Sequence, residues 1–192
     1  MQLTKEYIAE QDDCVRRNVD GYKKYMKDVC TYTRLHIIQE FIKGKEKILS
    51  VGSGAHEPVF MKTTHAIDVP AISGELLKQQ GWPGEFKQGS CDELPYGDKE
   101  FDAAICSEVL EHLPNFEVVR KTILEVDRVA KSWIITTPNV DKCPRHLQDK
   151  SHVQFWNEQQ IRELLPEQLR DVVEISKLSI FIFIKKWAAA LQ

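Results

Sequence analysis

The chain has 192 residues, of which 42% are hydrophobic and 29% are charged. This length fits one domain with one sizeable core, and this composition excludes a mainly disordered chain. The formal net charge is −3 and the basic residues are scattered along the chain, which argues against a protein that binds nucleic acid.

Membrane insertion, disulfide bonds and metal binding are not expected either. The longest apolar run covers residues 178–184 and is interrupted by Ser179, whereas a membrane-spanning helix needs about 20 apolar residues. The five cysteines are widely spaced and form no Cys-x-x-Cys pair, so neither a disulfide framework nor a zinc site is indicated. Reduced thiols of this kind are typical of a cytoplasmic protein.

Helical spacing dominates the first 45 residues. Within residues 33–42, Leu35, Ile38 and Ile42 fall on one helix face, and Gly44 provides a C-terminal stop. We therefore predict one domain over residues 1–192, of which residues 1–45 form an N-terminal helical cap.

From Lys47 onward, short apolar runs alternate with helical segments. The clearest helix lies between the last two of these runs, where the apolar positions from Phe116 to Val129 step by three and four residues. Such alternation predicts a parallel sheet whose strands are connected by helices on both faces. The predicted strands cover residues 47–51, 65–69, 85–90, 101–107 and 132–137.

The C-terminal part follows a different pattern. A helical segment at 158–167 precedes two apolar strands, 171–178 and 179–187, with no helix between them. Two strands joined by a tight connection must pair antiparallel. The predicted fold class is therefore α/β, with a seven-stranded, mostly parallel sheet and a C-terminal antiparallel hairpin that leaves one strand reversed at an edge.

Two glycines mark the turn after the first strand, in the segment LSVGSGAHEP (49–58). Gly52 and Gly54 stand where a strand turns into a helix, and glycine there lets a ligand approach the backbone closely. A tight turn that needs a positive φ would also explain them. Asp68 ends the next strand, where nucleotide-binding sheets place an acid that binds ribose hydroxyls.

A nicotinamide dinucleotide and S-adenosylmethionine both fit a glycine turn followed by such an acid. The dinucleotide fingerprint has a third glycine, and Glu57 occupies the equivalent position. Its carboxylate would face the pyrophosphate, which is electrostatically unfavourable. The sequence therefore disfavours an NAD-dependent oxidoreductase.

The segment QGSCDELPYGDKEFDAAICSEVLEHLPN (88–115) resembles the class I S-adenosylmethionine-dependent methyltransferases, specifically their small type 11 branch. Leu94–Tyr96, Phe101–Asp102 and Val109–His112 match the motifs of that branch at matching spacing, as do the glycine turn and the acid. The resemblance covers about residues 47–139. It implies a Rossmann-like fold, methyltransferase activity and S-adenosyl-L-methionine as the cofactor.

The same resemblance implies roles for residues around the glycine turn. Gly52, Ser53 and Gly54 would line the methionine end of the cofactor. Asp68 would bind the ribose hydroxyls, and Val69 would pack on the adenine.

Four residues after the third and fourth strands complete the implied cofactor site. Ser90 and Cys91 would edge the adenine, the latter through its backbone N–H. Cys106 and Ser107 would lie near the methionine amino group and the transferred methyl group.

The sequence departs from the family pattern at several of these positions. The family often has an acid at the position of Ser50, which helps to hold the ammonium group of the cofactor. Its adenine-reading Asp falls at Ser90, for which Asp92 could substitute, and its third glycine falls at His56. The short spacing between Gly54 and Asp68 predicts a short first crossover helix.

Methyl transfer needs alignment of the nucleophile and exclusion of water, and no catalytic triad is expected. His112, in the turn after the fourth strand, and His152, after the fifth, are the candidate catalytic residues, since open α/β sheets bind substrates at this edge. Structural roles are also open: His112 could support its loop, and His152 could pack against Trp156.

A small-molecule acceptor is predicted, with the methyl group going to an O or N atom of a sugar, lipid-linked or secondary-metabolite precursor. The [DNS]-P-P-[YFW] motif of methylases that act on nucleic-acid bases is absent, and SEVL (107–110) stands in its place. The alternative is a catalytically silent S-adenosylmethionine-binding module that acts through a protein partner.

Overall fold

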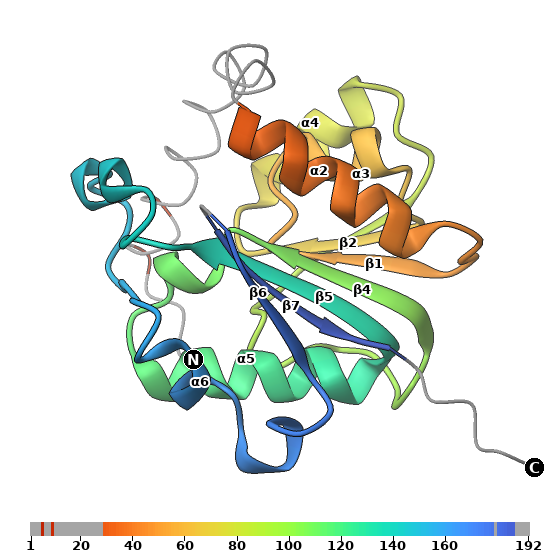
Figure 1. Cartoon of the computed structure of the whole chain (residues 1–192). Helices are drawn as coiled ribbons and strands as arrows, with labels where there is room; N and C mark the ends of the chain where they lie inside the picture. Colours follow the sequence, from red (N-terminus) through yellow and green to blue (C-terminus); the bar gives the residue numbers. More distant parts are fainter. Residues whose placement is uncertain (1–4, 6–8, 10–28, 179, 187–192) are drawn as a thin grey trace, which may run out of the picture.

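The computed structural model describes residues 29–178 and 180–186, together with Lys5 and Ala9 (Figure 1). Most of the predicted cap at 1–45 therefore lies outside the described residues. Its described part is helix α2 (Val29–Ile42), which contains the helix predicted at 33–42. Among the described residues, no helix combines the length and the apolarity needed to cross a membrane.

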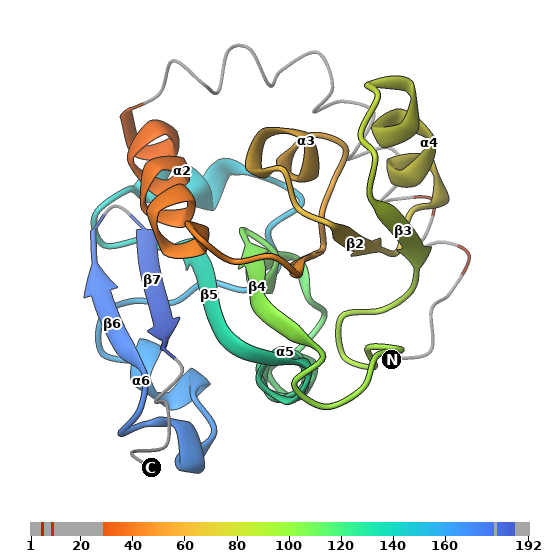
Figure 2. The ribbon, with the colours of Figure 1, turned by 90° about the vertical axis from the view of Figure 1, so that its right-hand side faces the viewer.

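One seven-stranded sheet organises the fold, in the order β3-β2-β1-β4-β5-β7-β6 (Figure 2). All strands are parallel except β7, so the predicted fold class is confirmed. The strands are β1 (Ile48–Val51), β2 (His65–Asp68), β3 (Glu85–Gln88), β4 (Phe101–Ser107), β5 (Ala130–Pro138), β6 (Glu174–Lys177) and β7 (Ile180–Lys185).

The prediction that the reversed strand lies at an edge is wrong. Strand β7 pairs with β5 on one side and with β6 on the other, so β6 forms the edge. The reason is burial: β7 has the apolar sequence IFIFIK and is largely buried, whereas the side chains of β6 are mostly exposed. A polar strand is suited to an edge that faces solvent.

Helices cover both faces of the sheet (Figure 1). Helix α2 lies on one face together with α3 (Glu57–Met61) and α4 (Ala71–Gln79), and α5 (Phe116–Val129) and α6 (Ile161–Leu164) lie on the other. Helix α3 is as short as predicted, and α4 was not predicted. Short 3-10 turns occur at η1 (Leu110–His112), η2 (Pro144–Gln148) and η3 (Glu167–Leu169).

Helix α6 is shorter than the predicted helix at 158–167. The Asn157 side chain accepts hydrogen bonds from the backbone N–H groups of Gln159 and Gln160, at 3.0 Å each, and so forms a local turn. Such side-chain turns compete with helix formation, and Pro166 follows the helix closely. The apolar spacing alone did not reveal these two limits.

Two apolar layers form the core because successive strand residues point to opposite faces. Ile48, Ile105 and Ile134 belong to the layer that packs against α2, whereas Leu49 and Trp133 belong to the layer that packs against α5. Both faces of the central strands are buried, which is typical of parallel sheets.

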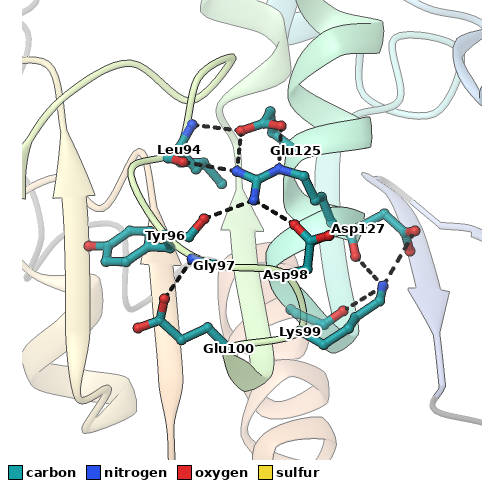
Figure 3. A network of polar contacts seen from close by, with 10 residues as sticks. Leu94, Tyr96, Gly97, Asp98, Lys99, Glu100, Glu125 and Asp127 are labelled. Atoms are coloured by element: carbon teal, nitrogen blue, oxygen red, sulfur yellow. Dashed lines mark hydrogen bonds and ion pairs between the residues drawn. The ribbon is translucent and has the colours of Figure 1, made fainter.

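A network of polar contacts fastens the loop before β4 to helix α5 (Figure 3). The Arg128 guanidinium donates to the carbonyl oxygens of Leu94 at 2.9 Å and Tyr96 at 2.8 Å, and to the carboxylate of Asp98 at 3.0 Å. It also forms two bonds to Glu125, whose carboxylate accepts a bond from the Leu94 backbone N–H at 2.8 Å. One side chain thus orders the loop that leads into a central strand.

Replacing Arg128 with Ala should lower the free energy of unfolding by about 2–3 kcal/mol, because several charge-assisted hydrogen bonds are lost together. Denaturant unfolding measures the change. Arg120→Ala on the same helix is the matched control, since the only described contact of Arg120 is with the Phe116 ring. Equal stability of the two variants would contradict this role for Arg128.

Candidate functional site

The candidate site lies at the carboxyl end of the parallel strands, between β1 and β4. At this point the strand order reverses: β2 and β3 follow on one side of β1, and β4 and β5 follow on the other. Gly52 follows β1 with φ +63°, and a Cβ atom there would come within 2.5 Å of the Val109 side chain from the turn after β4. The two turns are therefore in close contact, and only glycine fits at position 52.

Gly54 has φ +54°, and a Cβ atom at this position would meet nothing within 4 Å. Its backbone N–H donates to the Asp68 carboxylate at 3.0 Å, as do the Ser73 hydroxyl at 2.8 Å and the Val69 backbone N–H at 2.9 Å. The sequence-predicted pair of Gly54 and Asp68 is thus brought together directly. The space beside Gly54 is open to a ligand.

The backbone N–H groups of the glycine turn already have partners. Those of Gly52 and Ser53 donate to the Ile67 carbonyl oxygen at 2.9 and 3.2 Å, and that of Gly54 donates to Asp68. The polar groups with which the edge can hold a cofactor are therefore mainly side chains.

Beside Asp68, the residues predicted to surround the adenine are largely buried. Val69 and Ser90 are 8% and 9% exposed, and the Ser90 hydroxyl is hydrogen-bonded to Asp92. The Asp92 carboxylate thus lies beside the position where the family has its adenine-reading Asp. This position agrees with the expectation, drawn from the sequence resemblance, that Asp92 could substitute for the missing Asp at position 90.

The two thiols near the site face the core. Cys91 is buried and its Sγ accepts a hydrogen bond from Thr122 at 3.3 Å. Cys106 is fully buried in the layer that packs against α5. Burial raises the pKa of both thiols, that of Cys91 to about 11. Cys106 is therefore not accessible from the site, whereas Ser107 beside it is partly exposed.

Glu57 lies at the candidate site, although the sequence analysis assigned it no role there. Helix α3 places its carboxylate against the end of β1, where the Ser50 hydroxyl donates to Oε1 at 2.8 Å. A carboxylate therefore lies next to Ser50, the position at which the family often has an acid. The sequence contains one indication of this contact: a serine at position 50, where the family often has an acid, is followed by an acid at position 57.

The environment of Glu57 raises the pKa of its carboxyl from 4.5 to about 7. Burial is the main cause, and the nearby Glu108 carboxylate adds to it. Hydrogen bonds from Ser50 and Ser107 and the positive charge of Arg34 act in the opposite direction. A carboxyl held in this way gains from a cation placed beside it.

A second group of polar side chains follows β4 and β5, on the side of the edge where an acceptor is expected. The Ser107 and Thr136 hydroxyls lie 3.1 Å apart, and Thr136 donates to Glu108 at 2.9 Å. Glu108 has φ +56°, a conformation that costs energy for a residue other than glycine, and it pairs with Arg34 of α2 at 3.1 Å. Helix α2 thus reaches the site through one ion pair.

The two candidate catalytic histidines are close together. The rings of His112 and His152 are 4.9 Å apart and nearly perpendicular, and the His146 ring stacks on His152 at 5.7 Å. Burial is the main cause that lowers the pKa of His112 and of His152 below the ordinary value. His152 therefore lies at the carboxyl edge, although its sequence position is 40 residues beyond His112.

Comparison with known proteins shows what this chain is similar to. Residues 49–133 match the family model described as a methyltransferase domain. A search of curated protein sequences finds no match to the chain.

Solved structures share the fold at low sequence identity. An S-adenosylmethionine-dependent methyltransferase of Thermotoga maritima, described as a possible histamine N-methyltransferase, has a TM-score of 0.71 at 12% identity and covers 93% of this chain and 100% of its own. The 1,6-didemethyltoxoflavin-N1-methyltransferase of Burkholderia thailandensis, solved with S-adenosylhomocysteine, has a TM-score of 0.65 at 15% identity over 98% and 92%. The magnesium protoporphyrin IX methyltransferase of Synechocystis, also solved with S-adenosylhomocysteine, has a TM-score of 0.62 at 14% identity over 92% and 97%.

These matches confirm the resemblance to class I S-adenosylmethionine-dependent methyltransferases. Residues 49–133 match a methyltransferase domain, and the chain shares the fold of the solved methyltransferases. The predictions of a methyltransferase and of S-adenosylmethionine as its cofactor are confirmed with it.

The pKa of Glu57 predicts how stability depends on pH. Between about pH 4.5 and 7 the folded protein keeps a proton that the unfolded chain releases, so the free energy of unfolding falls as pH rises and levels off above 7. Glu57→Gln removes this effect. The variant should gain about 1–3 kcal/mol relative to the parent between pH 5 and pH 8.

Denaturant unfolding of parent and variant at the two pH values measures this gain. The exposed Glu93 provides the matched control, since Glu93→Gln leaves the buried carboxyl in place. A stability difference between parent and Glu57→Gln that is the same at both pH values would contradict the raised pKa.

Proposed function

We propose that this methyltransferase transfers a methyl group to an O or N atom of a small-molecule acceptor and forms a single domain over residues 1–192 with residues 1–45 as its cap. The observation that carries the proposal is the convergence of Gly54, Asp68 and Glu57 at one edge of the sheet. This convergence combines an open backbone position with two carboxylates. Such a combination suits a ligand with ribose hydroxyls and a positively charged amino-acid end.

The residues of the edge fit S-adenosylmethionine. The bound cofactor supplies a methyl group that its positive sulfur already activates. Gly54 offers the open space that its missing Cβ leaves, Asp68 offers carboxylate oxygens at the end of β2, and Ser90 with Asp92 offers polar atoms at the end of β3. Gly52 and Ser53 hold the turn in place, Val69 supplies an apolar wall, and Cys91 and Cys106 form the buried floor.

Glu57 is assigned the role of holding the ammonium group of the methionine end. Its carboxylate is held by the Ser50 hydroxyl and lies close enough to Ser107 for a hydrogen bond. A cation bound there would offset the unfavourable burial of the negative charge. Glu57 thus compensates for the departure at Ser50.

The acceptor is assigned to the space beyond Ser107 and Thr136, with His112 and His152 on its far side. The net charge of −3 and the absence of the nucleic-acid methylase motif favour a small molecule over a nucleic acid. The similar structures named above include methyltransferases of small heterocyclic acceptors, which agrees with this proposal. Turnover with a panel of hydroxyl and amine acceptors separates it from a catalytically silent module.

Gly54→Val tests where the cofactor binds. A β-branched side chain would fill the open space beside the turn, so the affinity for S-adenosylmethionine should fall at least tenfold, which is about 1.4 kcal/mol. Titration calorimetry measures the affinity.

Gly81→Val is the matched control for this substitution. Gly81 also has a positive φ, +74°, and open space at its Cβ position, but it lies in the turn after α4. Both variants carry the same kind of backbone strain, and only the Gly54 variant should lose affinity. If both variants bind as the parent does, the cofactor lies elsewhere.

Affinity for the cofactor should depend on the protonation of Glu57. The charged carboxylate is the form that binds an ammonium group, so affinity should fall as pH drops below about 7. Calorimetry between pH 5.5 and 8 measures this trend, and Glu57→Gln should bind weakly at every pH. A parent whose affinity is constant over this range would contradict the assignment.

A further inference from the structure

Three side chains on the acceptor side form a cluster of metal-ligand type. Glu111, His112 and His152 each offer one ligand atom, and these atoms all lie within 4.8 Å of one another. Two imidazoles and one carboxylate are a recurrent ligand set for divalent first-row transition metals. No cysteine takes part, so the spacing of the cysteines could not indicate this cluster.

Glu111 is the least accessible member of the cluster. It is 1% exposed, and Thr137 donates to its Oε2 at 3.0 Å. Its other oxygen, Oε1, is buried and has no hydrogen-bond partner. A buried carboxylate oxygen without a donor is costly, and a cation would satisfy it.

His112 is oriented as metal-binding histidines commonly are. Its Nδ1 is 2.9 Å from the Ser151 carbonyl oxygen, which can only accept, so the ring proton lies on Nδ1. The Nε2 atom then carries a lone pair and lies 4.0 Å from Glu111 Oε1. A second-sphere bond from the other ring nitrogen to a carbonyl is the usual support of a histidine ligand.

His152 completes the cluster from the segment after η2. Its side chain is 8% exposed, and its Nδ1 is buried without a hydrogen-bond partner. The backbone N–H groups of the next two residues, Val153 and Gln154, donate to the Glu111 carbonyl oxygen at 2.8 and 3.0 Å. The two segments that supply the ligands are therefore fastened to each other.

We propose that Glu111, His112 and His152 bind one divalent first-row transition-metal ion, such as Zn²⁺ or Co²⁺, at the acceptor side of the cofactor edge. Two ligands of a tetrahedral ion of this kind are about 3.4 Å apart, so the ligand atoms need to close in by up to about 1.4 Å. Three protein ligands leave coordination positions for water or for an oxygen or nitrogen atom of the acceptor. The two histidines then act through the ion and not as general bases.

The surrounding charges are compatible with a cation at this position. Arg34, whose charge acts on Glu111, is paired with Glu108 at 3.1 Å, so its charge is balanced. His146 stacks on the outer side of His152, and Asp149 lies 3.8 Å from His152 Nε2. The cluster therefore has a second carboxylate, that of Asp149, close to one of its histidines.

Metal titration of the untagged full chain tests the site without any acceptor or cofactor. Zn²⁺ calorimetry should show one equivalent bound, and Co²⁺ should give a visible absorption band without a sulfur charge-transfer band. His152→Ala and Glu111→Gln should each weaken binding at least tenfold. The exposed His36 on α2 provides the matched control, since His36→Ala should bind as the parent does.

Several outcomes would overturn the proposal: no stoichiometric Zn²⁺ binding, a sulfur charge-transfer band, or unchanged affinity in both cluster variants. Far-UV circular dichroism establishes that the variants are folded, and Glu111→Gln retains the shape that accepts the bond from Thr137. The link between the ion and the acceptor rests on the proposed function, whereas ion binding does not. A bound ion in a protein that methylates nothing would thus separate the two proposals.

Discussion

Burial of both faces of the parallel sheet is the constraint on which the rest of this structure depends. Strands β1, β4 and β5 are buried along almost their whole length, so their side chains serve the two apolar layers. Polar chemistry is therefore displaced to the turns that follow the strands. The glycine turn, Asp68, Ser107 and the SEVLEH turn all occupy such positions, and the switch in strand order between β1 and β4 brings them to one place.

Carboxylates at this edge are held at a cost to stability. Glu57 and Glu111 come from different turns, and burial raises the pKa of both. Stability alone would favour neutral side chains at such positions, and sites that bind cations are where proteins commonly retain buried acids. The proposed ammonium contact of Glu57 and the proposed metal contact of Glu111 give the two residues the same physical role, because a bound cation would offset the cost of burying each carboxylate.

Much of the fold and part of the site could be predicted from the chain alone. Strand and helix periodicities gave the sheet, and the glycine turn and Asp68 gave the cofactor edge, because these signals are local. These local signals do not show which strands and side chains lie next to each other in the folded protein. The order β5-β7-β6 depends on which hairpin strand is more apolar on both faces, and the contact between Ser50 and Glu57 depends on how α3 folds back. The acidic contribution of Glu57 was accordingly missed.

The sequence was enough to predict the class of fold, the resemblance to methyltransferases and the edge of the sheet at which a cofactor would bind. Each of these predictions depends on the spacing of residues within one segment of the chain, which can be counted directly in the sequence. The tertiary structure alone decided which side chains meet: Glu57 with Ser50, Glu108 with Arg34, and Glu111 with His112 and His152. Arg34 and Glu108, like Glu111 and His152, lie on segments that are far apart in the chain, because parallel strands return to the same edge only after a long crossover. Ser50 and Glu57 are only seven positions apart, and they meet because α3 folds back on the end of β1.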